Sequence, residues 1–190
     1  MSLPPWRSPL SRALHRNRSL PSSRYVQLAT IDAQQRPHNR TVVFRGFYEP
    51  GSQLQFITDV RSNKVAHIAQ NPWVEACWYF SKTREQFRIA GQLQLITADS
   101  PDLQPARRKA WQQISNSSRE QFAWPLPAAP RKQEMLALEV AAPNLDQPLA
   151  SFGLLLLNPI AVDHLELRGT PQNRWQYLWE GGWSVMAINP

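Results

Sequence analysis

Residues 25–44 read YVQLATIDAQQRPHNRTVVF, and this stretch decides the fold. Tyr25 to Ile31 alternates in side-chain character with the period of two that is typical of a half-buried strand. Polar turn residues follow from Asp32 to Pro37. Thr41 to Phe44 is β-branched or aromatic at every position, which favours a second, central strand. The stretch therefore predicts two strands joined by a short turn.

The succession of strands and brief turns continues to residue 95. Asn63 to Gln70 has the apolar spacing of a short helix, which either Ser62 or Asp59 is placed to cap. Further strands are predicted at Leu54–Thr58, Val74–Phe80 and Gln86–Leu95. Five strands with one short helix predict an antiparallel barrel and argue against a doubly wound sheet.

The flanking regions add helices and further strands. Residues 1–23 form a basic arm, in which the spacing of Leu10, Ala13 and Leu14 predicts a short amphipathic helix. Residues 99–148 are predicted to form a helical excursion, and strands are expected to close the chain. We therefore expect a single domain over residues 1–190, mainly β with flanking helices. The helices of the excursion are expected at Asp99–Ser118 and Arg131–Val140, and the closing strands at Phe152–Leu157, Ala161–Leu167, Trp175–Trp179 and Trp183–Ile188.

The charge balance predicts an anionic partner. The formal net charge is +7, and 17 of the 21 basic Lys and Arg residues are arginine, whose planar guanidinium suits bidentate contacts with anions. Nucleic acid, a membrane surface and a phosphorylated small molecule all fit this charge. The eight tryptophans are able to stack on bases, but most fall inside strand and helix patterns, which favours core packing over a nucleic-acid-binding module.

Several kinds of chemistry lack a signature. The single cysteine, Cys77, excludes an internal disulfide, and the four histidines lack metal-ligand spacing, so we expect no metal. No Gly-rich nucleotide loop, nucleophile elbow or paired carboxylate is present. The chain has neither an apolar run long enough to span a membrane nor an apolar N-terminal signal, which predicts a cytoplasmic protein without a membrane partner.

Groups able to bind phosphate gather at the ends of the predicted strands. Residues 61–64, Arg-Ser-Asn-Lys, lie where a strand passes into a helix, so main-chain N–H groups, the positive helix end and two cations converge there. Arg40 opens a neighbouring strand and supplies a third charge. The alternative is a set of surface basic residues without a ligand. The other candidates are Arg45, Thr58, Arg84, Gln86 and Arg88.

Three stretches carry a resemblance to a known family. They are YVQLATIDAQQRPHNRTVVFRGF at 25–47, LQFITDVRSNKVAHIAQNPWVEACWYF at 54–80 and KTREQFRIAG at 82–91. In order and spacing they resemble the pyridoxamine 5'-phosphate oxidase-related FMN-binding family. The resemblance implies an antiparallel, Greek-key-like split β-barrel that forms a homodimer, with FMN in a cleft at the subunit interface.

The resemblance also implies cofactor-binding residues. Arg40 to Val43 correspond to the strand beside the flavin, with Arg40 reaching the phosphate. Asn63 stands where the family usually has an arginine, which Arg61 is placed to replace, and Leu165 stands where a tryptophan is expected. Gln86 corresponds to a glutamine at the flavin edge, supplied across the dimer. The implied FMN contacts are Arg40, Thr41, Val42, Val43, Thr58, Arg61, Ser62, Asn63, Lys64, Gln86 and Arg174.

The substrate side departs from the oxidases. Thr170 and Gln172 stand where an Arg–x–His pair is expected, and Ser115 where an arginine holds the substrate phosphate. We therefore expect an FMN-dependent oxidoreductase acting on an unknown small molecule other than a vitamin B6 phosphate, with no acid or base assigned. Alternatives are a split barrel that uses deazaflavin or haem, and a non-enzymatic FMN-binding protein. Candidate substrate contacts are Arg45 in place of a lysine, Trp111 in place of a tyrosine, and the nearby Arg119.

Overall fold

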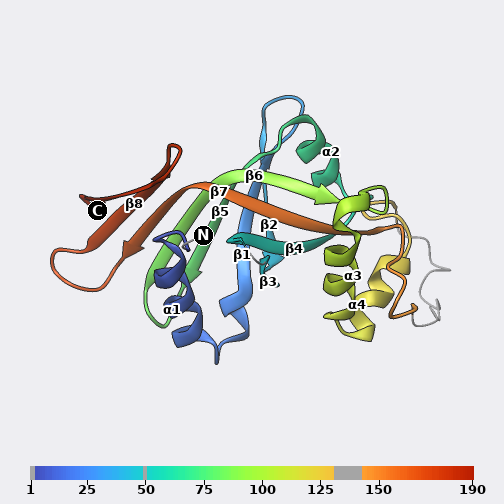
Figure 1. The fold of residues 1–190 in the computed structure, drawn as a ribbon, viewed down its shortest axis with the longest axis horizontal. Coiled ribbons are helices and arrows are strands. Elements are labelled where there is room, and N and C mark those ends of the chain that lie inside the picture. The colour runs from blue at the N-terminus through green and yellow to red at the C-terminus, as the bar shows by residue number, and fades with distance from the viewer. Residues whose placement is uncertain (1–2, 49–50, 131–142) are drawn as a thin grey trace.

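The computed structural model describes residues 3–48, 51–130 and 143–190. Within them, antiparallel strands form one curved sheet in the order β2-β1-β5-β6-β7-β4-β3, and the β8–β9 hairpin continues from β7 (Figure 1). The strands are β1 (Tyr25–Ile31), β2 (Pro37–Val43), β3 (Gly46–Tyr48), β4 (Gln53–Asp59), β5 (Trp73–Phe80), β6 (Glu85–Ile96), β7 (Phe152–Glu166), β8 (Asn173–Trp179) and β9 (Trp183–Ile188).

Helices flank this sheet at separate places, as predicted. In Figure 1, α2 lies beyond one end of β1, α1 runs beside β5, and α3 and α4 sit together at the far end of β7. The helices are α1 (Arg7–Asn17), α2 (Asn63–Gln70), α3 (Gln104–Gln112) and α4 (Asn116–Glu120), with single 3-10 turns η1 (Pro21–Arg24), η2 (Pro101–Leu103) and η3 (Gln121–Ala123). No helix among the described residues is long and apolar enough to cross a membrane.

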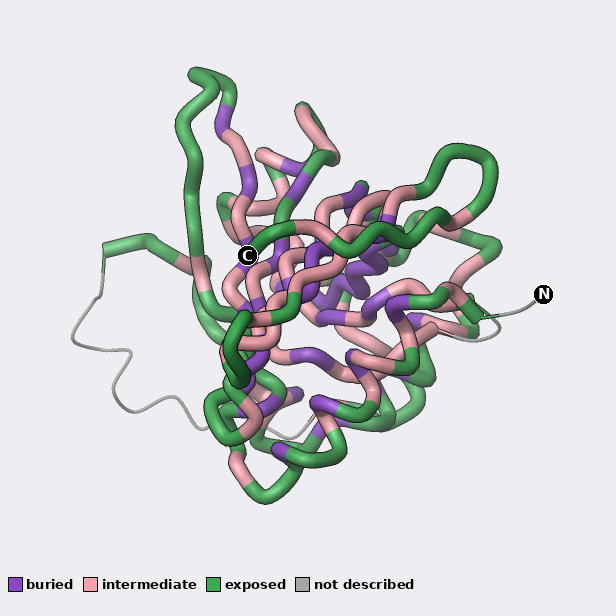
Figure 2. Tube along the Cα trace, turned by 90° about the vertical axis from the view of Figure 1, so that its left-hand side faces the viewer, coloured by how far each residue is buried: buried purple, intermediate pink, exposed green. Residues whose placement is uncertain are grey.

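Alternation along the strands builds the core. In β5, Val74, Ala76, Trp78 and Phe80 are buried while the residues between them face outward. Trp78 packs on Phe80 with ring centroids 5.2 Å apart, and its indole N–H donates to the carbonyl of Ser23 at 3.0 Å. Buried residues gather along the centre of the sheet, whereas the C-terminal hairpin is largely exposed (Figure 2). The inward face of the sheet is thus apolar and buried, and the outward face is exposed or half-buried.

The two strands predicted on either side of Pro159 form one strand, β7. The prediction of a break was wrong because a bulge absorbs the irregularity: Ala90 pairs with Ala161 and Gly91 with Pro159, which leaves Ile160 of β7 as the extra residue. At Gly91 a Cβ atom would collide with the carbonyl oxygen of Asn158, so only glycine allows this close approach. The bulge lets a proline sit within a long strand.

The helix predicted at Asp99–Ser118 is broken into two. α3 ends at Gln112, and Ser115 then begins α4 as its N-cap, with its side chain accepting from the N–H of Ser118. A serine that bonds to its own main chain in this way starts a new helix instead of continuing the old one. The helix predicted at Arg131–Val140 lies outside the described residues.

Candidate functional site

A cavity of about 410 Å³ lies between β2, the end of β4 and the start of α2. β2 contributes Arg40 to Val43, and Arg45 follows just beyond the strand. The helical excursion covers the other side with Phe122 and Trp124. The cavity therefore joins the basic residues of the barrel to an aromatic wall. Its remaining lining includes Thr58, Asp59, Lys64 and Ser118.

Lys64 is the centre of a polar cluster in this cavity. Its ammonium donates to the hydroxyl of Ser62 at 2.9 Å and to the hydroxyl of Thr58 at 3.1 Å. Burial lowers the pKa of Lys64, the charge of Arg40 lowers it further, and the carboxylate of Asp59 raises it. Arg40, Lys64 and Asp59 all line the cavity. Such an arrangement is suited to an anion that bridges the two cations.

The N-terminus of α2 faces the same cluster without a side-chain cap. Ser62 occupies the N-cap position in an extended conformation, but its hydroxyl donates to the carbonyl of Asp59 at 2.7 Å instead of accepting from the helix. The prediction that the side chain of Ser62 or Asp59 caps the helix was therefore wrong, although Ser62 does occupy the N-cap position. When no side chain accepts a hydrogen bond from the first N–H groups of a helix, these groups favour a negatively charged ligand.

Arg40 reaches the cavity from β2. Its Nη1 atom donates to the hydroxyl of Thr30 at 2.7 Å and to the carbonyl of Leu28 at 3.0 Å, both on β1. Burial lowers the pKa of Arg40, but a guanidinium remains charged in proteins. The structure thus brings Arg40, Thr58, Ser62 and Lys64 together, as the sequence predicted.

Arg61 and Asn63 lie outside the cavity, unlike Arg40 and Lys64. The Arg61 guanidinium donates to both carboxylate oxygens of Asp59, at 2.9 and 2.6 Å, and to the carbonyl of Trp124 at 2.9 Å. Neither Arg61 nor Asn63 is among the described residues that line the cavity. Arg61 therefore ties the end of β4 to the helical excursion, a role that its position in the sequence did not indicate.

Gln86 and Arg174 lie on the outward face of the sheet. Leu165 of β7 pairs with Gln86 of β6 on one side and with Arg174 of β8 on the other. Arg174 also donates to both oxygens of Asp163, at 3.1 and 2.8 Å. Neither residue lines the cavity of its own chain in the described structure.

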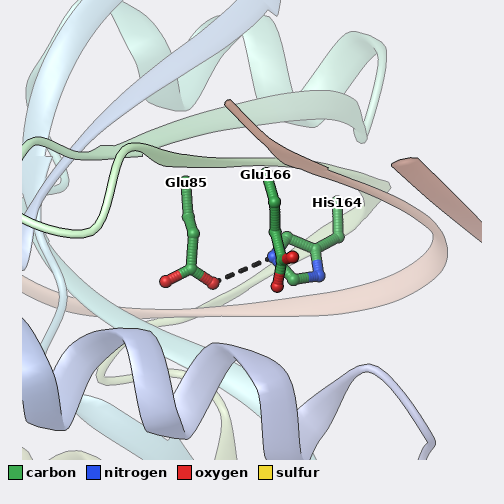
Figure 3. Close-up of side chains that lie close together, drawn as sticks. All are labelled: Glu85, His164 and Glu166. Carbon is green, nitrogen blue, oxygen red and sulfur yellow. Dashed lines mark hydrogen bonds and ion pairs between the residues drawn. The ribbon is translucent and has the colours of Figure 1, made fainter. Parts of the chain in front are cut away.

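A second group of polar side chains lies on the opposite, buried face of the sheet from Gln86. Glu85, His164 and Glu166 converge there (Figure 3). The Nε2 atom of His164 lies 3.0 Å from a carboxylate oxygen of Glu85, and both side chains are buried. The His164 ring stacks on Phe87, with centroids 4.0 Å apart. Sequence spacing missed this group because its members lie on different strands. Arg16 and Arg168 line the same small cavity as the two carboxylates and balance their charge.

Two predicted substrate contacts lie inside the helical excursion. Trp111 is fully buried, and its indole N–H donates to the carbonyl of Asn144 at 2.8 Å. Arg119 is also buried and donates to the carbonyls of Trp111 and Ile114. Neither residue lines the cavity, whereas Arg45 does. Arg45 is thus the one predicted substrate contact that the described structure brings to this cavity.

The residues present fit FMN. Two cations and a helix N-terminus without a side-chain cap provide donors of the kind that a phosphate dianion needs. Among the described strands β2 pairs only with β1, so the prediction of a central strand at Thr41 to Phe44 was wrong and β2 is an edge strand. The main-chain groups along its free edge are available to a heteroaromatic ring. The cavity volume accommodates part of such a cofactor.

Comparisons with known proteins agree with this geometry. The sequence profile of the pyridoxamine 5'-phosphate oxidase FMN-binding domain matches residues 3–97. Over 193 residues, spanning 98% of this chain and 97% of the relative, the chain is 40% identical to pyridoxine/pyridoxamine 5'-phosphate oxidase 2 of Arabidopsis thaliana. A pyridoxamine 5'-phosphate oxidase-related, FMN-binding protein from Nostoc punctiforme has a crystal structure with a TM-score of 0.97, 56% identity and full coverage of both chains.

A more distant neighbour shows the same fold. PhzG from Burkholderia lata, in complex with tetrahydrophenazine-1-carboxylic acid, has a TM-score of 0.79 at 19% identity and covers 96% of this chain and 91% of its own. Together the matches confirm the predicted split β-barrel and FMN as the cofactor of its family. The chain belongs to the pyridoxamine 5'-phosphate oxidase FMN-binding family.

Proposed function

We propose that the protein is an FMN-dependent oxidoreductase in which Arg40, Lys64 and the N-terminus of α2 hold the FMN phosphate. The observation that carries this proposal is the polar cluster in the cavity, in which Lys64 contacts the hydroxyls of Thr58 and Ser62. Lys64 is a half-buried ammonium near a guanidinium, and in the described structure its hydrogen-bond partners are hydroxyls, so a dianion that binds between the two cations stabilises both. Thr58 and Ser62 orient Lys64, because their hydroxyl oxygens accept from its ammonium while both hydroxyls donate to the carbonyl of Asp59.

The remaining residues of the cavity position the ring system. Thr41, Val42 and Val43 present main-chain groups at the free edge of β2, where a flavin ring is held by hydrogen bonds that carry no charge. Phe122 and Trp124 cover the opposite side and limit the access of water. FMN, when bound, supplies the hydride or electron transfer, so the chain needs only to bind, orient and desolvate its substrate.

The protein is proposed to act as a homodimer. Gln86 and Arg174 belong to the predicted flavin contacts but face away from the cavity of their own chain, so a partner chain is needed to bring them to it. Tyr25, Trp73 and Tyr79 are exposed on the same outward face, where a second subunit would cover them. Family membership supports this assembly.

Arg45 is proposed to bind an anionic group of the substrate. It lines the cavity, its Nε atom is buried, and no side chain in the described structure accepts a hydrogen bond from it. Burial and the nearby charge of Arg24 lower the pKa of Arg45, so an anion there relieves both effects. A planar substrate that carries a carboxylate or phosphate fits a site between Arg45 and Trp124.

The experiment is to purify the protein, release its ligand by denaturation and identify that ligand by mass and absorbance. FMN at about one per subunit supports the proposal; haem, a deazaflavin or no ligand contradicts it. FMN-loaded protein is then mixed with anionic heteroaromatic compounds and their neutral analogues under oxygen. Oxygen consumption with an anionic compound, lost in Arg45→Gln, supports turnover. Consumption with none indicates an FMN-binding protein without oxidase activity.

A further inference from the structure

A hydrogen-bonded chain lies behind Arg40, on the side away from the cavity. The hydroxyl of Thr30, on β1, accepts from Nη1 of Arg40 at 2.7 Å and lies 3.0 Å from Nδ1 of His67, on α2. Thr30 is fully buried, with 0% of its surface exposed. Three elements, β1, β2 and α2, therefore meet at a single hydroxyl oxygen.

The proton arrangement in this chain follows from the chemistry of the groups. A guanidinium only donates, so the oxygen of Thr30 accepts from Arg40. The proton of the Thr30 hydroxyl is then free to donate, and Nδ1 of His67 is the acceptor within reach. Nδ1 accepts only when His67 is neutral with its proton on Nε2. This one arrangement of protons thus satisfies the hydrogen bonds between Arg40, Thr30 and His67.

We propose that Thr30 and His67 are positioning residues that hold the Arg40 guanidinium toward the FMN phosphate, and that they do so only while His67 is neutral. Protonated His67 must donate from Nδ1 to the Thr30 oxygen, which leaves the Thr30 hydroxyl proton without its acceptor and changes the arrangement that holds Arg40. This inference rests on the proposed function, because it concerns how the phosphate site is set.

The groups around His67 favour its neutral form. From β2, His38 stacks near it with ring centroids 4.7 Å apart, and Arg40 lies beyond Thr30. From the turn after β1, Asp32 accepts from His38 at 2.9 Å. Burial, His38 and Arg40 lower the pKa of His67, and Asp32 raises it. Strand β6 is also packed on α2, but none of its charged groups contributes to the pKa shift of His67. FMN affinity should therefore fall as the pH drops through the pKa of His67.

The first test compares two substitutions of similar size. Thr30→Val removes the hydroxyl and keeps the shape, whereas Thr30→Ser keeps the hydroxyl. We expect Thr30→Val to raise the FMN Kd about tenfold at pH 8, the effect of losing one hydrogen bond to a charged group, and Thr30→Ser to stay within about twofold. Riboflavin, which lacks the phosphate, should bind both variants and the unchanged protein equally. Flavin fluorescence quenching measures each Kd.

The second test removes the titrating group at the surface of α2. His67→Asn keeps an acceptor near the position of Nδ1 but does not titrate between pH 5.5 and 8. The FMN phosphate itself titrates near pH 6, with a pKa of about 6, so the readout is the ratio of the two Kd values. We expect the Kd of the unchanged protein relative to that of His67→Asn to rise several-fold from pH 8 to 5.5. His15→Asn, at an exposed histidine of α1, should follow the unchanged protein.

The outcomes separate this inference from the proposed function. FMN binding that is unaffected by Thr30→Val, or parallel pH profiles for the unchanged protein and His67→Asn, would overturn the positioning role alone. A failure of the unchanged protein to bind FMN at any pH would overturn the proposed function and this inference with it. Thermal unfolding of each variant, matched to the unchanged protein, excludes a general loss of structure.

Discussion

Gln86 and Arg174 lie at the same level of the sheet, on either side of Leu165, because β7 pairs with β6 along one edge and with β8 along the other. Glu85 and Phe87, the neighbours of Gln86 in sequence, are buried, so Gln86 faces outward. The two polar side chains therefore form a row on the open face of the sheet, apart from the cavity that holds Lys64. A site that uses both the row and the cavity requires two chains.

The first prediction concerns the subunit assembly. Sedimentation equilibrium of the FMN-loaded protein should give twice the chain mass of 21.8 kDa. Tyr79, which pairs with Gln86 and is 45% exposed in one chain, should be covered in the dimer. Tyr79→Glu buries an unpaired charge there and should weaken the dimer about a hundredfold or more.

Loss of FMN should accompany dissociation of the Tyr79→Glu dimer. Leu145→Glu changes an equally exposed apolar residue in the helical excursion and should leave both mass and FMN content unaltered. A mass near 21.8 kDa with FMN still bound would refute the two-chain site.

The second prediction concerns Lys64. Lys64→Ala removes one cation from the phosphate site and should raise the FMN Kd about tenfold to a hundredfold, because a charge-assisted hydrogen bond contributes ~1.5–3 kcal/mol. Lys82→Ala removes an exposed lysine from the turn before β6 and should not change the Kd. Equal affinities for the two variants in a fluorescence titration would move the phosphate to another part of the molecule.

The third prediction concerns stability at low pH. The hydrogen bond from His38 holds the pKa of Asp32 well below its usual value of 3.8, assisted by hydrogen bonds from Arg36 and Gln34 and opposed by burial. A carboxyl whose pKa is lower in the folded state stabilises that state fully above its unfolded pKa. This contribution should begin to fall as the pH drops below about 4, and it should be lost only as the pH falls through the lower pKa of the folded state.

Urea unfolding of Asp32→Asn provides the measurement for Asp32. The variant should be less stable than the unchanged protein at pH 7, and the difference should be smaller at pH 2, where part of the folded-state advantage has been lost. Asp102→Asn, at an exposed aspartate in the turn before α3, should behave like the unchanged protein at both pH values. A constant difference between Asp32→Asn and the unchanged protein across this range would show that the Asp32 charge is not responsible.

The fourth prediction concerns vitamin B6 phosphates, which the name of the Arabidopsis relative makes the first substrates to test. Ser115, Thr170 and Gln172 lack the charges that such a phosphate needs, and the Ser115 side chain is engaged as the cap of α4. We expect pyridoxine and pyridoxamine 5'-phosphate to be poor substrates or none. Formation of pyridoxal 5'-phosphate at about 1 s⁻¹ or faster would show that Arg45 rebuilds the substrate site.

Local patterns were sufficient to predict much of the fold. β1, β9 and α2 begin and end where the side-chain periodicity places them, because each element satisfies its own alternation or apolar stripe. The residue types at Arg40 and Lys64 indicated an anion site, but the reason for their proximity is not local: Arg40 lies in the middle of β2, and β2 meets β4 although the two are far apart in the strand order.

Features set by distant neighbours could not be predicted from local patterns. The continuity of β7 across Pro159 depends on the close approach allowed by Gly91, on another strand. The Arg61 side chain lies on Asp59 because a second contact with the helical excursion holds it there. Arg119 is buried because α4 begins anew at Ser115 and its guanidinium satisfies the carbonyls at the end of α3. None of these contacts leaves a periodic trace in the sequence.

The most direct test of the central claim is a comparison of FMN and riboflavin binding to the protein freed of its cofactor. The two ligands share the flavin ring and differ only in the phosphate that Arg40, Lys64 and the α2 N-terminus are proposed to hold. Several charge-assisted contacts predict that FMN binds with one site per subunit and about a hundredfold or more tighter than riboflavin. Equal affinities, or no saturable binding of FMN, would contradict the account.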